Sequence, residues 1–98
     1  MNLPVVLRRA ARDEFDAAID WYERQSSGLG SLFGDRVEAV FERISSTPEM
    51  HAAVYREIRR APIRGFPYSI YYRIRGGRIV VLAVFHNKHN PQVWKSRG

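Results

Sequence analysis

His86, Lys88 and His89 lie within one short segment near the end of the chain. Histidine side chains titrate near neutral pH, so the two imidazoles can serve as general base and general acid. A lysine ammonium beside them can stabilise negative charge on a phosphate. These three residues are therefore the candidate catalytic group if the chain cleaves a phosphodiester bond. A simpler interpretation stays open, in which His86 ends a strand with its ring packed and His89 is a loop residue. The sequence offers no suitable third ligand nearby, so we expect neither zinc nor another cofactor.

Residues 66–86, which precede these histidines, are typical of two β-strands joined by a tight turn at Gly76-Gly77. Consecutive glycines supply the positive φ angles that a two-residue hairpin loop requires. Pairing across this turn opposes Ile74 to Ile79, Tyr72 to Val81, Ile70 to Ala83 and Tyr68 to Phe85. It also places a mixed set on the opposite face of the hairpin, with Ser69, Tyr71 and Arg73 against Val84, Leu82 and Val80, and His86 near the end of this face. We predict that this second face is open and binds a partner, because an apolar strip bordered by arginine marks a binding surface.

The positive charge is concentrated in the second half of the chain. Residues 1–50 hold six arginines and nine acidic residues, which gives −3. Residues 51–98 hold ten basic residues and a single acid, Glu57, which gives +9. This asymmetry points to an anionic partner, either nucleic acid or an acidic protein. Arg59, Arg60 and Arg64 are expected to form a basic edge.

The length of 98 residues predicts a single domain spanning 1–98. There are no cysteines, which excludes disulfides and thiolate metal sites. The first residues lack the apolar core and preceding basic region of a secretory signal. No apolar run approaches the ~20 residues of a membrane span. We therefore expect a cytoplasmic protein that does not bind membranes.

Hydrophobic periodicity divides the chain into strands and helices. Residues 3–7 are apolar and predict a first strand, with Pro4 suited to an edge position or a strand end. Residues 9–47 predict a two-helix hairpin with a turn near Gly28 and an end before Pro48. The core-facing residues of its helices are expected to be Ala11, Phe15, Ala18, Ile19 and Tyr22, then Leu29, Leu32, Phe33, Val37, Val40, Phe41 and Ile44. Trp21 is expected to pack within the same hairpin.

A strand over residues 53–60 and the hairpin then form a β-meander over about 53–86, followed by a basic tail, 87–98. The element order is β-α-α-β-β-β. We therefore predict an α+β fold, with an antiparallel-rich sheet and the helix hairpin packed on one face.

Four groups of residues, taken together and in this order, resemble the RelE/ParE superfamily of toxins from bacterial type II toxin–antitoxin modules. They are Trp21-Tyr22, Gly28-Leu29-Gly30, Phe66-Pro67-Tyr68 leading into Ile70-Tyr71-Tyr72, and the tail His86…Pro91…Trp94…Arg97. The resemblance covers nearly the whole chain. It implies a small toxin that is neutralised by a partly disordered antitoxin and forms a toxin–antitoxin hetero-oligomer with it.

The superfamily has two branches, and the residues favour one of them. RelE-like members cut mRNA on the ribosome without a metal, whereas ParE-like members block DNA gyrase without nuclease chemistry. At the positions where RelE-like nucleases place two arginines and a tyrosine, this chain has Ser69, Lys88 and Trp94. An indole N–H donates a hydrogen bond but cannot act as a base. The resemblance therefore implies the ParE-like, gyrase-inhibiting branch. Two alternatives stay open: a ribosome-dependent endoribonuclease that uses His86, Lys88 and His89, and a non-toxic antitoxin-binding domain.

The antitoxin is expected to be acidic and apolar in alternation and to fold as it binds. The expected partner-binding residues are Arg59, Tyr71, Arg73, Val80, Leu82, Val84, Trp94 and Arg97. Trp94 either clamps the tail onto the domain or contacts the antitoxin. If the second sheet face is open, Leu82→Glu should weaken antitoxin binding and leave the fold intact.

Overall fold

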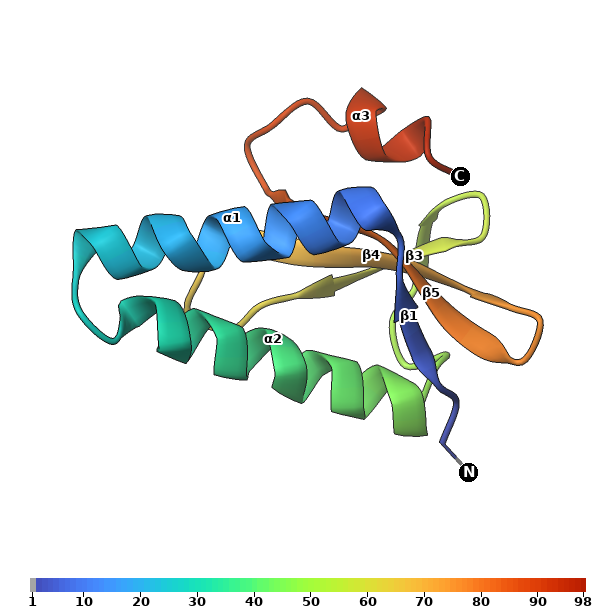
Figure 1. Cartoon of the computed structure of the whole chain (residues 1–98). Coiled ribbons are helices and arrows are strands. Elements are labelled where there is room, and N and C mark those ends of the chain that lie inside the picture. The colour runs from blue at the N-terminus through green and yellow to red at the C-terminus, as the bar shows by residue number, and fades with distance from the viewer. Residues whose placement is uncertain (1) are drawn as a thin grey trace.

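The computed structural model describes residues 2–98, which form one five-stranded sheet and three helices (Figure 1). The elements in chain order are β1 (Val5–Leu7), α1 (Arg9–Gln25), α2 (Leu29–Ser46), β2 (Ala53–Tyr55), β3 (Ile58–Pro62), β4 (Tyr68–Arg75), β5 (Arg78–His86) and α3 (Gln92–Lys95). The predicted α+β class with a two-helix hairpin is confirmed. No helix within the described residues is long and apolar enough to cross a membrane.

The strands lie in the order β1-β5-β4-β3-β2, so β1 is an edge strand as Pro4 predicts. β1 runs parallel to β5, and the remaining neighbours are antiparallel. The single strand expected over 53–60 is wrong, because this segment forms β2 and β3. The backbone reverses between them at Arg56, which has a φ of 52°. Val54 is consequently exposed while Ile58 is buried.

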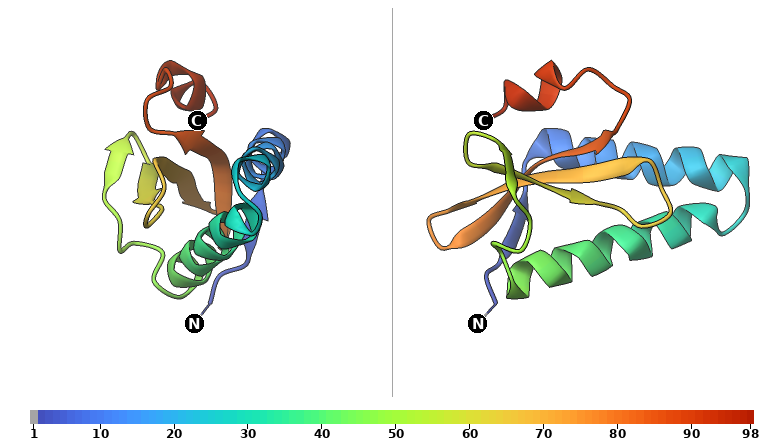
Figure 2. Two further views of the ribbon diagram at one scale, coloured as in Figure 1. Left: turned by 90° about the vertical axis from the view of Figure 1, so that its left-hand side faces the viewer. Right: turned by 180° about the vertical axis from the view of Figure 1, so that it is seen from behind.

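The helix hairpin packs on one face of the sheet, as the turned views show (Figure 2). The predicted stripes supply most of its buried residues: Ala11, Phe15, Ala18 and Tyr22 from α1, and Phe33, Val37, Val40, Phe41 and Ile44 from α2. The turn between the helices is held by Glu23, whose carboxylate accepts the backbone N–H groups of Gly28 and Gly30 at 2.8 and 3.0 Å. These bonds hold the pKa of Glu23 below its ordinary value.

The β4–β5 hairpin follows the predicted register only near its turn. Three predicted pairs are present: Ile74 with Ile79, Arg73 with Val80, and Tyr72 with Val81. Beyond them a bulge at Leu82 shifts the pairing by one residue, so Ile70 opposes Val84 and Tyr68 opposes His86. The predicted faces of Ala83, Val84 and Phe85 are therefore wrong. An extra residue in one strand exchanges the faces of every residue after it.

The second face of the sheet is also covered. Its buried residues form a cluster separate from the one under the helix hairpin: Ile58, Tyr71, Leu82, Ala83, Phe85 and Trp94. Leu82 is 0% exposed and Trp94 is 5% exposed. The chain turns back after β5 and lays α3 over this face. The prediction of an open face is therefore wrong, because the tail that carries Trp94 supplies its cover.

Candidate functional site

The cover of the second sheet face is held by stacking and by charge. The indole of Trp94 stacks on the ring of Tyr71, with centroids 4.1 Å apart and an interplanar angle of 16°. Trp94 thus clamps the tail onto the domain, which the sequence left undecided. Stacked aromatic rings contribute about 0.5–1.5 kcal/mol beyond their buried area. Tyr71 and Trp94 both pack inside the domain, so neither ring is available to a partner while the tail is in place.

Arg73 and Arg97 are tied into this cover. Arg73 is 7% exposed, and its Nη1 donates to the carbonyl oxygen of Gly98 at 3.0 Å. Arg97 makes a two-pronged ion pair with Glu14 of α1, with N–O distances of 2.9 and 2.8 Å. It also donates to the carbonyl of Leu82 at 3.1 Å. Both arginines were predicted to bind a partner; in the structure they fasten the C-terminal end across the sheet.

Glu14 holds the tail in place, a role that the sequence does not indicate. Besides pairing with Arg97, its Oε1 accepts the backbone N–H of Val84 at 3.1 Å. β1 ends opposite Val81, so no neighbouring strand is present to accept the N–H of Val84 on this side of β5. The Glu14 carboxylate accepts it in place of a strand carbonyl. The partners of Glu14 lie 70 and 83 residues away along the chain, and no local pattern indicates them.

A groove of about 610 Å³ lies between α1 and the ends of β4 and β5. Its walls are more apolar than polar, and Trp21, 51% exposed, stands at its side. The lining residues are Glu14, Ala17, Ala18, Trp21, Tyr22, Pro67, Tyr68, Val84, Phe85, His86 and His89. Trp21 was expected inside the helix hairpin, but its ring meets Tyr22 edge-on from the outer side. Such a half-exposed aromatic in an apolar groove is typical of a surface that contacts another protein.

The two candidate catalytic histidines lie together at the end of this groove. Their rings stack, with centroids 4.9 Å apart. His86 Nδ1 accepts the backbone N–H of Lys88 at 3.1 Å, and its ring meets Tyr68 edge-on at 5.2 Å. Partial burial, together with the nearby His89 and Lys88, lowers the pKa of His86. Within residues 2–98, no third His, Asp, Glu or Cys joins the pair in a group suited to a metal.

Two of the three positions that distinguish the superfamily branches lie away from the histidines. Ser69 is fully buried and its hydroxyl is 2.7 Å from Asn87 Oδ1. Trp94 is buried against Tyr71 on the second sheet face. Lys88 alone is exposed beside the histidine pair. Two of the three side chains therefore have structural contacts and do not face the groove.

The other predicted partner-binding residues also make contacts within the domain. Arg59 Nη1 donates to the carbonyl oxygen of His51 at 2.6 Å, which fixes the turn before β2. Val80 is partly buried against the cluster under α3. Val84 is 1% exposed and belongs to the core under the helix hairpin, because of the bulge at Leu82. A partner-binding role for these residues stays a prediction.

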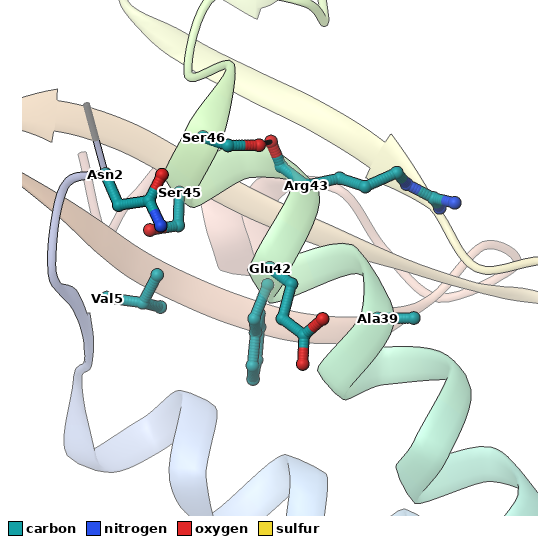
Figure 3. Close-up of a pocket in the computed structure, with 8 residues that line it drawn as sticks. Asn2, Val5, Ala39, Glu42, Arg43, Ser45 and Ser46 are labelled. Atoms are coloured by element: carbon teal, nitrogen blue, oxygen red, sulfur yellow. Dashed lines mark hydrogen bonds between the residues drawn. The ribbon is translucent and has the colours of Figure 1, made fainter.

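A second hollow, of about 700 Å³, lies between the N-terminal segment and the end of α2 (Figure 3). Glu42 and Arg43 line it, and their side chains extend in different directions. The Ser45 hydroxyl donates to the carbonyl oxygen of Leu3, and the Leu3 N–H donates to the Ser45 carbonyl at 3.0 Å. These bonds join the N-terminal segment to α2. Among the described residues that line the hollow, no pair is suited to acid–base chemistry.

Comparisons with known proteins define the family. The family model described as "ParE toxin of type II toxin-antitoxin system, parDE" matches residues 5–91. Toxin ParE2 of Mycobacterium tuberculosis, in strains H37Rv and CDC 1551 / Oshkosh, is 30% identical over 79 residues, which is 81% of this chain and 75% of the relative. A structure titled "Chromosomal ParDE TA system from P. aeruginosa" shares the fold, with a TM-score of 0.73 and 17% identity over 86% of this chain and 95% of that one. The chain therefore belongs to the ParE toxin family of type II toxin–antitoxin systems.

Proposed function

We propose that this ParE-family toxin inhibits DNA gyrase by binding to it, with no chemical reaction of its own, and that a cognate antitoxin neutralises it. The observation that carries this proposal is the family match over residues 5–91, combined with the burial of two positions where RelE-like nucleases place catalytic residues. Ser69 is buried against Asn87, and Trp94 is buried against Tyr71. Neither position supplies the cation or the acid–base group of a metal-free nuclease.

A supercoiling assay with purified gyrase tests this function directly. We expect the purified full-length chain, at about micromolar concentration, to inhibit supercoiling of relaxed plasmid. Addition of its antitoxin should restore the activity. The absence of inhibition at this concentration would contradict the proposal. Harmless over-expression together with tight antitoxin binding would instead support the non-toxic, antitoxin-binding alternative.

The groove beside α1 is the surface that best suits the antitoxin. It offers an apolar floor and the half-exposed ring of Trp21, and the basic half of the chain carries +9. An acidic segment with apolar residues would gain contact area in the groove and be steered by the charge. Arg73 and Arg59, expected to pair with such a segment, are engaged within the domain. Trp21→Ala should weaken antitoxin binding while leaving the melting temperature nearly unchanged.

One observation favours a second candidate function. His86 and His89 stack at the mouth of the groove beside the exposed Lys88. With a lowered pKa, His86 is largely neutral at pH 7 and available as a base. A ribosome-dependent endoribonuclease would then produce codon-position cuts in translated mRNA that disappear in His86→Ala and His89→Ala. Intact transcripts after induction would exclude it.

A further inference from the structure

A cluster of cations lies at the end of the molecule opposite the turn between α1 and α2. Tyr55, the last residue of β2, has the guanidinium of Arg56 5.1 Å and the ammonium of Lys95 5.3 Å from its ring centroid. The turn between β2 and β3, the tip of the β4–β5 hairpin and the C-terminal end of α3 all lie at this end (Figures 1 and 2). Arg75 and Arg78 face each other across that tip as paired residues.

This cluster has little opposing charge. Glu57 is its acidic member, and its Oε1 contacts Arg75 and lies 3.6 Å from Arg73 Nη1. Glu57 is also the only acid in residues 51–98. Arg56 and Arg78 are exposed and Lys95 is partly exposed, and no ion pair within the described residues involves any of the three. Uncompensated cations from three separate elements make a positive surface.

The aromatic rings at this end are already covered. Tyr71 and Trp94 are buried and stacked on each other, and the Tyr55 ring lies beneath two cations. Proteins that bind single strands need accessible aromatic faces on which unpaired bases can stack. A duplex presents its phosphates outward and keeps its bases stacked, so it requires only positioned cations. The chemistry here therefore fits a duplex better than a single strand.

We propose that the surface formed by Arg56 and Lys95 beside Tyr55, together with Arg75 and Arg78 at the β4–β5 hairpin tip, binds the phosphate backbone of duplex DNA. It is separate from the apolar groove beside α1, so it leaves that groove to a protein partner. A contact made through phosphates does not depend on base sequence, because phosphate contacts carry no sequence information. It also does not depend on whether the toxin acts on gyrase.

Fluorescence anisotropy with a labelled duplex of random sequence tests the proposal. The test variant of the full chain combines Arg56→Gln, Arg78→Gln and Lys95→Gln, which removes three charges and keeps the side-chain lengths similar. We expect its Kd to rise about tenfold or more, and the slope of log Kd against log salt to fall by about three, roughly one per lost phosphate contact.

A matched control removes the same charge from another surface. The combination of Arg9→Gln, Arg12→Gln and Arg24→Gln changes three arginines of α1, and glutamine has nearly the same helix propensity as arginine. We expect its Kd for the duplex to stay within about threefold of the parent, since its charges lie outside the proposed surface. Circular dichroism of both variants should match the parent spectrum.

Each contrary result would overturn the proposal. An unchanged Kd in the test variant would show that the surface does not contact DNA. An equal loss in the control would show that only net charge matters. Tighter binding of a single-stranded RNA of the same length would show that the surface prefers RNA to a DNA duplex. If the test variant kept its DNA affinity and lost affinity for the antitoxin, the surface would be a protein interface.

Discussion

The two faces of the sheet are closed in different ways. On one face, α1 and α2 bury a continuous cluster in which Phe33 meets Phe15, Tyr22, Phe66 and Tyr68 at centroid distances of 5.1–6.2 Å. The other face is covered by α3, a helix of four residues, through the single large side chain of Trp94. Long helices distribute the cover over many side chains, whereas a short helix depends on one ring and a few polar contacts. The first face should therefore be robust, and the second should respond strongly to changes in the tail.

Leu82→Glu should have the largest effect of any change considered. Leu82 is fully buried beneath the tail, so glutamate would place an unpaired carboxylate in an apolar site. We expect a loss of more than about 5 kcal/mol, which is enough to unfold a small domain. Val93→Glu, on the exposed side of α3, adds the same charge and should fold normally. The measurements are circular dichroism and thermal melting. A folded Leu82→Glu protein would show that this sheet face is open and not buried beneath the tail.

Phe33→Ala tests the face under the helix hairpin. Phe33 is fully buried and contacts four aromatic rings from α1 and from the segment before and within β4. Truncation should cost about 3–5 kcal/mol in urea unfolding, through lost burial and the cavity left behind. Leu32→Ala, one residue away and 41% exposed, is the matched control and should cost under about 1 kcal/mol. A cost for Phe33→Ala below that for Trp94→Ala would reverse the ranking of the two faces.

Trp94→Ala tests the cover of the other face. Removing the ring uncovers Tyr71 and Leu82, and we expect a loss of about 2–4 kcal/mol. Hydrogen exchange should rise mainly in β4 and β5 residues of this face, since the helix hairpin keeps its own contacts. Trp21→Ala removes an equally large ring that is 51% exposed and should change stability by under about 1 kcal/mol. Equal losses in the two variants would mean that Trp94 is not a clamp.

The same contrast separates what the sequence could predict from what it could not. The apolar spacing from Ala11 to Ile44 predicts the helix hairpin and its buried face, because helical periodicity is a local property. Gly76 and Gly77 predict the turn, and both have positive φ angles in the structure. The register near that turn follows correctly. No glycine or proline marks the bulge at Leu82, and the predicted faces of the β5 residues after it are wrong.

The candidate site is less predictable than the fold because its contacts are long-range. The histidine pair can be found from spacing alone, since His86 and His89 belong to one segment. The groove they border also needs α1, and the position of Trp21 within the helix does not show that its ring faces outward. Glu14 and Arg97 are 83 residues apart, and only tertiary packing brings them together. In the sequence alone, the sheet face that the tail covers therefore looks like an open strip for a partner.

Arg97→Gln should weaken the same cover by a smaller amount. The Arg97–Glu14 pair is about one-fifth exposed on each side chain, so it is partly screened by solvent. We expect a loss of about 1–2 kcal/mol, and a double-mutant cycle with Glu14→Gln should give a coupling of about 1 kcal/mol. Arg24→Gln, on the exposed side of α1, should be near neutral. A coupling near zero would assign the cover to Trp94 alone.

The smallest expected effect is a pH dependence from the histidine at the groove. The pKa of His86 is lowered in the folded protein, so between that pKa and the unfolded value near 6.5 the unfolded chain binds more protons. Stability from this group is therefore complete above about pH 6.5 and is lost as the pH falls through the folded pKa. His86→Asn, which cannot be protonated, should show a smaller fall in melting temperature than the parent between about pH 7.5 and pH 5.5. The burial of His51 also lowers its pKa and gives the same sign, so His51→Asn must be compared in parallel. An unchanged pH profile in His86→Asn would place the acid sensitivity elsewhere and show that titration of His86 is not linked to folding.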